Sequence, residues 1–188
     1  MNIAVLIYHD VLDFEVSSAM TAFKTASRFT DSPLEIFTIH RTRASVLGTS
    51  GLVMTPSYAM SAAPEPDVLI VPGGAGIEKL FKDSISRDYF KLQKKRVKHL
   101  ILGTNAALLM GEYGLLESHS VTAFPTLLET LWKYNPSEVL DARSVTDGNL
   151  RSISRSSAML EVCLAVIDLE FGVAKLVQQH LGLNNTAT

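Results

Sequence analysis

The residues that could do chemistry lie in two turns, each of which follows an apolar run. Gly73-Gly74 comes after residues 68–71, and Gly103-Thr104-Asn105 comes after residues 100–102. In open parallel sheets, ligands bind outside the carboxyl ends of the strands, where such turns expose backbone N–H groups. A third turn follows Tyr8 at the end of the first apolar run. Together the three turns predict a ligand site at one edge of a sheet.

The turn Gly103-Thr104-Asn105 is the most informative, because an apolar strand gives way to a helix within one residue. This arrangement resembles a nucleophile elbow, which presents a side chain beside a helix N-terminus and favours an anion or a developing oxyanion. The Thr104 hydroxyl would need a nearby base to act as a nucleophile. Capping of the following helix by Thr104 or Asn105 is the alternative prediction, since both residue types cap helices well.

Two further residues have functional and structural interpretations. Arg155 lies among serines just before the last predicted helix. There it could hold a carboxylate or phosphate, or it could be a surface arginine beside a serine cap. Cys163 follows the apolar stripe of that helix, which indicates a core cysteine.

The elements that must position these residues alternate along the chain. Short apolar runs alternate with amphipathic patterns, which predicts an α/β fold with a mostly parallel sheet covered on both faces. Strands are expected at residues 2–8, 34–40, 68–71, 100–102 and 121–123, and hairpins at 46–54 and 143–153. Helices are expected at residues 14–29, 84–98, 106–112, after Pro125, and at 157–181. No repeat or long linker divides the chain, so one domain over residues 1–188 is expected.

Composition limits the function classes. The 188 residues carry a formal net charge of −2, which does not supply the basic field of a nucleic-acid-binding protein. One cysteine allows no internal disulfide, and the five histidines show no metal-binding spacing, so no metal site is predicted. The first apolar run, residues 3–7, does not predict a signal peptide, and no run approaches the roughly 18 residues of a membrane span. A cytoplasmic location without membrane contact is expected.

Four motifs together resemble the ThiJ/PfpI superfamily. They are DVLIVPGGAG, LILGTNAALLMGEYGLL, SVTAFP and VTDGNLRS followed by LEVCLAVIDLEFG, and their order and spacing match from Ile3 to Gly172. The superfamily includes isonitrile hydratases, 2-oxoaldehyde-handling proteins and the amino-terminal domains of AraC-type regulators, and the first and last of these are the nearest in sequence character. The resemblance implies a flavodoxin-like three-layer sandwich, like that of class I glutamine amidotransferases. It also implies a homodimer, an elbow cysteine flanked by supporting carboxylate or histidine groups, and no cofactor.

Carried over residue by residue, the resemblance places the family's acidic residue at Glu15 and its glycine turn at Gly73 and Gly74. The elbow cysteine falls at Thr104, or at Gly103 after a one-residue shift, and neither supplies a thiol. A strained backbone would show which of the two occupies the elbow. The family's histidine becomes Phe124. Cysteine chemistry is therefore not expected, because a threonine hydroxyl has essentially no alkoxide at neutral pH.

Three functions remain open from the sequence. The leading prediction is a regulatory domain, with little or no catalysis, that binds a small molecule in the former active-site cleft through Gly73, Gly74, Asn105 and Arg155. The chain is expected to contain no DNA-binding module, so a regulator would need one from a partner or from outside this chain. The first alternative is an isonitrile hydratase-like or 2-oxoaldehyde-handling enzyme that uses Glu15 and Thr104. The second is an interaction protein that acts through its dimer surface.

Overall fold

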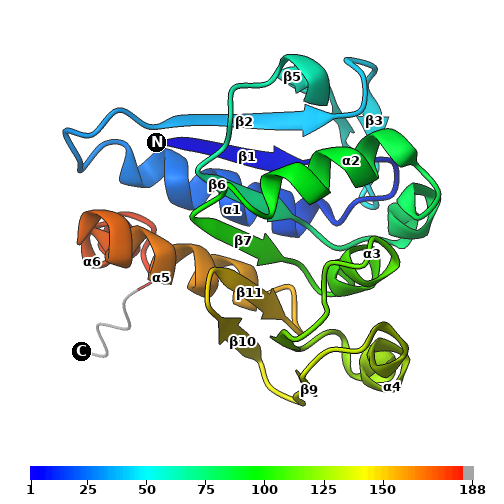
Figure 1. Cartoon of the computed structure of the whole chain (residues 1–188). Coiled ribbons are helices and arrows are strands. Elements are labelled where there is room, and N and C mark those ends of the chain that lie inside the picture. The colour runs from blue at the N-terminus through cyan, green and yellow to red at the C-terminus, as the bar shows by residue number, and fades with distance from the viewer. Residues whose placement is uncertain (184–188) are drawn as a thin grey trace.

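The computed structural model describes residues 1–183 and is built around a seven-stranded sheet (Figure 1). The strand order is β10-β11-β7-β6-β1-β2-β5. Every neighbouring pair is parallel except the hairpin of β10 and β11. The strands are β1 (Asn2–Leu6), β2 (Glu35–His40), β5 (Tyr58–Ala59), β6 (Val68–Val71), β7 (His99–Leu102), β10 (Ser144–Asp147) and β11 (Leu150–Ile153). The predicted mostly parallel α/β sheet is confirmed.

Helices cover both faces of this sheet. They are α1 (Asp13–Ala26), α2 (Ser84–Gln93), α3 (Ala106–Glu112), α4 (Leu128–Leu131), α5 (Ala158–Phe171) and α6 (Ala174–His180). Helices α1, α5 and α6 pack against one another on one face. From β1 to β2 the chain moves across the sheet in one direction, and from β6 to β7 in the other. Because parallel crossovers are right-handed, α2 lies on the face opposite α1, as Figure 1 shows.

Short elements fill the connections. Strands β3 (Val46–Leu47) and β4 (Val53–Met54) form an antiparallel hairpin, as predicted, and β8 (Ser120–Val121) pairs in parallel with β9 (Glu138–Val139). The 3-10 turns are η1 (Met60–Ala62), η2 (Ala75–Leu80), η3 (Pro125–Leu127) and η4 (Trp132–Tyr134). The helix predicted after Pro125 is thus split into η3, α4 and η4.

The central strands are buried on both faces. All four residues of β6 and all four of β7 are buried, and Ile3 to Leu6 of β1 are fully buried. A strand covered by helices on both sides needs apolar residues at every position, which is why these segments are continuous hydrophobic runs in the sequence. The core therefore lies along the middle of the sheet and fixes where the carboxyl ends of β1, β6 and β7 meet.

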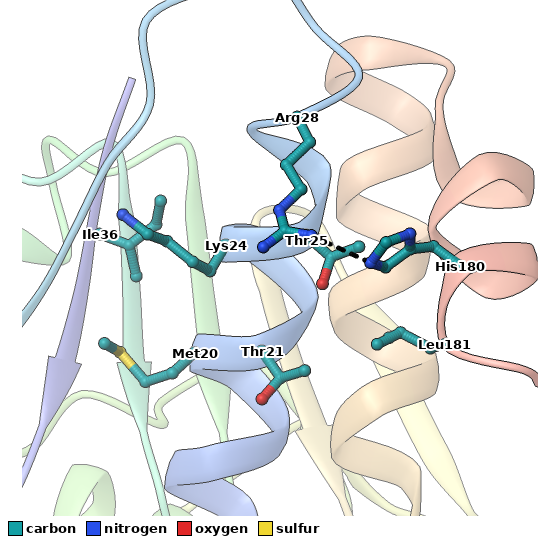
Figure 2. A pocket seen from close by; sticks show the side chains of 8 residues that line it. All are labelled: Met20, Thr21, Lys24, Thr25, Arg28, Ile36, His180 and Leu181. Atoms are coloured by element: carbon teal, nitrogen blue, oxygen red, sulfur yellow. Dashed lines mark hydrogen bonds between the residues drawn. The ribbon is translucent and has the colours of Figure 1, made fainter.

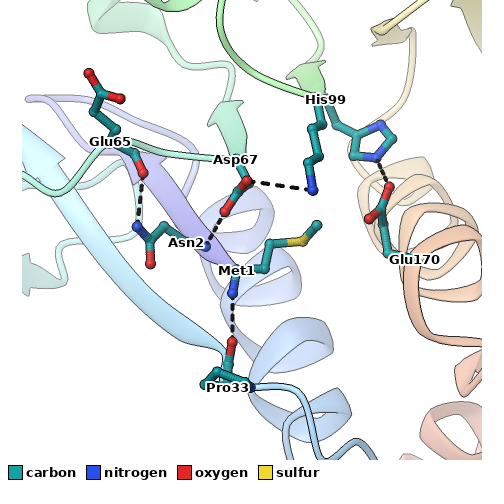
Figure 3. Close-up of polar contacts among 8 residues, drawn as sticks. Met1, Asn2, Pro33, Glu65, Asp67, His99 and Glu170 are labelled. Atoms are coloured by element: carbon teal, nitrogen blue, oxygen red, sulfur yellow. Dashed lines mark hydrogen bonds and ion pairs between the residues drawn. The ribbon is translucent and has the colours of Figure 1, made fainter.

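Polar contacts tie the amino ends of the same strands together (Figure 3). The Asn2 N–H donates to Asp67 at 2.8 Å, and His99 Nε2 lies 2.7 Å from Glu170 Oε1. Arg151 donates to His99 Nδ1 at 3.0 Å. A guanidinium can only donate, so Nδ1 is the acceptor. His99 therefore connects Arg151 of β11 to Glu170 of α5, which is a structural role.

Three predicted helix boundaries are wrong, and the first helix, predicted over residues 14–29, ends at Ala26. The single helix predicted over residues 157–181 is divided at Gly172, which has φ 66° and donates its N–H to the Asp168 carbonyl. A glycine in this left-handed conformation ends a helix without steric cost. The helix predicted to reach residue 98 ends at Gln93, and the N–H groups of Lys98 and His99 donate to the carbonyl of Asp67, which directly precedes β6.

Within residues 1–183, no helix is long and apolar enough to cross a bilayer.

Candidate functional site

The three turns singled out in the sequence meet at the carboxyl edge of the sheet. The Tyr8 hydroxyl donates to the Pro72 carbonyl at 2.7 Å, and the Leu12 N–H donates to the Gly73 carbonyl at 2.8 Å. The Asn105 side chain joins the other two turns: its Oδ1 accepts from the Gly74 N–H at 2.9 Å, and its Nδ2 donates to the Gly74 carbonyl at 3.0 Å. The ends of β1, β6 and β7 are therefore held together by direct hydrogen bonds.

Glycine is required at both positions of the Gly73-Gly74 turn. A Cβ on Gly73 would lie 2.3 Å from Thr104 Oγ1 and 2.8 Å from Asn105 Oδ1. Gly74 has φ 152°, and a Cβ there would lie 2.3 Å from the Asp10 carbonyl oxygen. The missing side chains let the two turns approach closely, which is a packing role as well as a conformational one.

Glu15 lies in the first turn of α1 and is completely buried. Its Oε2 accepts from the Gly73 N–H at 2.7 Å, and its Oε1 accepts from the Ser156 hydroxyl at 2.8 Å and, more distantly, from the Thr104 N–H at 3.4 Å. The two N–H partners can only donate, so both carboxyl oxygens act as acceptors. The pKa of the neighbouring Tyr8 lies well above its usual value, mainly because the side chain is buried and to a smaller extent because of Glu15.

The geometry around Glu15 also decides which residue can carry a side chain at the elbow. A Cβ on Gly103 would lie 2.0 Å from Glu15 Oε2 and 2.3 Å from the Gly73 nitrogen, so no side chain fits there. The Thr104 side chain instead lines a cavity and is 6% exposed. Neither Gly103 nor Thr104 has a positive φ. Backbone strain therefore does not mark either residue as the elbow.

The cavity at Thr104 is small and open at the surface. It has a volume of about 200 Å³, below the roughly 300–1,000 Å³ usual for ligand pockets. It is lined by Leu12, Gly74, Ala75, Thr104, Asn105, Phe124, Thr126 and Leu127. Phe124 is half-exposed, and its N–H donates to the Thr104 carbonyl at 2.7 Å. The rim therefore presents an aromatic ring, which cannot act as an acid or a base.

Arg155 lies over this rim but does not line the cavity. Its guanidinium carbon is 5.7 Å from the centre of the Phe124 ring, and its Nη1 donates to the Ser154 carbonyl at 3.2 Å. The side chain is exposed. Arg155 can therefore reach an anion at the mouth of the cavity while its charge faces the ring.

The N–H donors of the glycine turn are already used by the protein. Glu15 accepts the Gly73 N–H, and Asn105 Oδ1 accepts the Gly74 N–H. An oxyanion hole needs donors aimed at the place where negative charge develops on a substrate. Here the donors point at the protein's own side chains, so the turn closes the structure instead of presenting free N–H groups.

The capping prediction for Asn105 is wrong. Asn105 occupies the N-cap position of α3 with φ −124° and ψ 7°, yet its side chain makes no capping hydrogen bond. The amide is directed at Gly74 instead. Since one side chain cannot serve both groups, the contact between the two turns replaces the local cap.

The sequence analysis missed Ser156. Its hydroxyl donates to Glu15, although the two residues are 141 positions apart. The serine-rich segment around Arg155 was the available signal, but serine before a helix usually indicates a cap, and nothing local pointed to α1.

The only cysteine, Cys163, lies in α5 and is fully buried, as predicted. Burial raises the pKa of its thiol, so it supplies no thiolate to the cleft. Among residues 1–183, no group of three or more His, Cys, Asp or Glu side chains is placed to hold a metal ion.

Comparison with known proteins identifies the family to which this fold belongs. The DJ-1/PfpI family model matches residues 1–169. An isonitrile hydratase from Pseudomonas putida is 28% identical over 153 residues, which cover 79% of this chain; the chain spans only 65% of that enzyme's length.

Solved structures with the same fold include several from this family. A ThiJ/PfpI family protein from Pseudomonas syringae has a TM-score of 0.87 at 19% identity, covering 100% of this chain and 78% of that one. Drosophila melanogaster DJ-1beta has a TM-score of 0.84 at 19% identity, with 96% of each chain covered. An AraC family transcriptional regulator from Pseudomonas putida has a TM-score of 0.77 at 18% identity, covering 96% of this chain and 98% of that one. The family model, matched over most of the chain, shows that this protein belongs to the DJ-1/PfpI family.

Proposed function

We propose that this protein is a DJ-1/PfpI-family domain that binds a small molecule at the Thr104 cavity without turning it over. The observation that carries the proposal is the chemistry of the cleft: its lining includes the Thr104 hydroxyl and no cysteine, and Glu15 and Asn105 already occupy the N–H donors of the glycine turn. A cysteine is a few per cent thiolate at neutral pH, whereas a threonine hydroxyl is not measurably ionised. The loss of a nucleophile usually costs several orders of magnitude in rate.

The cavity limits the ligand. About 200 Å³ admits only a small molecule, which would meet the Thr104 and Thr126 hydroxyls on one side and the Phe124 ring on the other. Arg155 above the ring would favour an anionic or strongly polar group at the mouth. A regulatory role, as the name of the AraC-type structural relative suggests, would couple this binding to a partner or a second copy. We include a homodimer, a cytoplasmic location and a single domain in the proposal.

An enzyme without cysteine is the second candidate, and the burial of Glu15 is the observation in its favour. A buried carboxylate is a common general acid or base. Against it, Glu15 contacts the Thr104 N–H and not the hydroxyl, and both of its oxygens are already bonded to donors. The isonitrile hydratase relative makes isonitriles the first substrates to test.

The test measures binding and turnover on the same samples. Cyclohexyl isocyanide and methylglyoxal are added to the wild type, to Thr104→Ala and to Glu15→Gln, with exposed Thr146→Ala and Glu129→Gln as matched controls. Product is followed by gas chromatography or absorbance, and binding by amide NMR shifts of Gly74 and Thr104. Shifts without product, lost in Thr104→Ala, would support the proposal. Turnover by the wild type that falls in both cleft variants would refute it and favour the enzyme.

A further inference from the structure

A second and larger cavity lies away from the Thr104 cleft, at the other end of α1. It has a volume of about 450 Å³, within the usual range for ligand pockets. Met20, Thr21, Lys24, Thr25, Arg28, Ile36, His180 and Leu181 line it, and we name it the α1–α6 pocket (Figure 2). Lys24 follows Glu15 by nine residues, which places the pocket about 14 Å along the helix axis from the cleft, at ~1.5 Å per residue.

The charges of the α1–α6 pocket are unbalanced. Lys24 and Arg28 are both exposed, and no carboxylate lines the cavity. Within residues 1–183, neither cation has a carboxylate oxygen within 4.0 Å. The neighbouring carboxylate of Glu35 accepts a hydrogen bond from the Tyr58 hydroxyl at 3.0 Å. Two cations four residues apart repel each other, so an anion between them would relieve that repulsion.

Cations near the C-terminus of a helix are usually explained by their attraction to the negative end of the helix dipole. Lys24 lies in the last turn of α1, where the macrodipole is equivalent to about half a unit charge. Half a charge does not balance two cations. The third basic residue in the lining, His180, supplies no negative charge to balance them: its Nε2 lies 3.1 Å from Arg28 Nη1, which can only donate. The pocket therefore holds an excess of positive charge.

The rest of the α1–α6 pocket suits an apolar body. The apolar lining residues are Met20 and Ile36 on one side of α1 and Leu181 on the other, and Thr25 lies beside the Arg28 guanidinium (Figure 2). A second hollow of about 410 Å³ shares Thr21 and Leu181 with the pocket and adds Phe14, Leu160 and Leu183 to its lining. A pocket that combines cations with apolar side chains is the pattern that holds an amphiphilic anion.

We propose that the α1–α6 pocket binds an organic carboxylate with an apolar body. Arg28 holds the carboxylate with Lys24 nearby, and the body lies along Thr21 and Leu181 toward the neighbouring hollow. When the carboxylate arrives, it accepts hydrogen bonds from Arg28, which then shares or releases its bond to His180. This site is independent of the Thr104 cleft and of the function proposed for it.

The experiment is calorimetric titration of the full chain with octanoate and with 4-phenylbutyrate, which pair the same charged group with a linear and an aromatic body. Octan-1-ol and acetate serve as ligands that lack the charge and the body, respectively. We expect both larger carboxylates to bind, with affinity that falls as salt rises, and neither comparison ligand to bind comparably. The His180 ring resonances should shift during the same titration followed by NMR.

Variants assign the site. Arg28→Gln should weaken octanoate binding about tenfold or more, Lys24→Gln less, and Thr21→Phe should block it by filling the cavity. Lys91→Gln, an exposed lysine on α2, is the charge-matched control and should bind as the wild type does. Thr104→Ala should also bind as the wild type does, which separates this proposal from the one for the cleft.

Three results would overturn the proposal. The first is no binding of either carboxylate at millimolar concentration. The second is equal weakening in Lys91→Gln and Arg28→Gln. The third is octan-1-ol binding as tightly as octanoate. Circular dichroism of each variant checks its folding, and the shift of the His180 ring in the wild type tests the site without any variant.

Discussion

Substitution of Glu15 tests the reasoning about the cleft most directly. In Glu15→Ala, the N–H of Gly73, the hydroxyl of Ser156 and the N–H of Thr104 all lose their acceptor. Each buried donor left unsatisfied costs about 1–3 kcal/mol, and the cavity left by the side chain adds to that cost. We therefore expect the free energy of unfolding to fall by about 4 kcal/mol or more.

Glu15→Gln should cost much less. The amide oxygen can still accept the Gly73 N–H, and the Ser156 hydroxyl can rotate to accept from the new amide nitrogen. Only the Thr104 N–H, already distant at 3.4 Å, then lacks an acceptor. The neutral amide also avoids the cost of burying a charge, so the net loss should be about 1–2 kcal/mol.

Urea unfolding followed by circular dichroism measures both variants. The exposed Glu129→Gln control should stay within about 0.5 kcal/mol of the wild type. If Glu15→Ala costs no more than Glu15→Gln, the three donors do not depend on the carboxylate and the reasoning fails. If Glu15→Gln stabilises the protein, the carboxylate is kept for a purpose other than stability, which would favour the enzyme hypothesis.

Three further predictions test other parts of the structure. Gly103→Ala should lower the melting temperature by several degrees or prevent folding, because its Cβ would lie 2.0 Å from Glu15 Oε2; a melting temperature equal to that of the wild type would contradict this packing. Cys163 should resist Ellman's reagent at pH 8 in the native protein and react fully in guanidinium, because burial raises its pKa; fast native labelling would show an accessible thiol. Hydrogen bonds from the Ser120 backbone and from His119 lower the pKa of Asp147. Its contribution to stability is therefore present above the unfolded-state pKa of about 3.9 and is lost as the pH falls through the folded-state pKa. In Asp147→Asn, the free energy of unfolding should depend less on pH in the acid range.

The arrangement of strands was largely predictable, because helix-covered strands must be apolar throughout. β6 and β7 were found from their continuous hydrophobic runs, and α3 was predicted with its observed bounds. The break at Gly172 was missed because the apolar pattern continues across it, and only the left-handed φ of that glycine separates α5 from α6. Hydrophobic periodicity reports burial, and both helices on either side of the break are partly buried.

The family, the absence of cysteine from the turn after β7 and the burial of Cys163 could all be obtained from the sequence, because motifs and residue types are local properties. The tertiary structure decided which groups share hydrogen bonds. From the sequence, Asn105 was a candidate helix cap and Ser156 had no predicted role. In the structure, Asn105 bonds to Gly74 and Ser156 bonds to Glu15, each from a distant part of the chain. A short polar side chain has several possible partners of equal chemistry, and only the folded backbone determines which of them lies within about 3 Å.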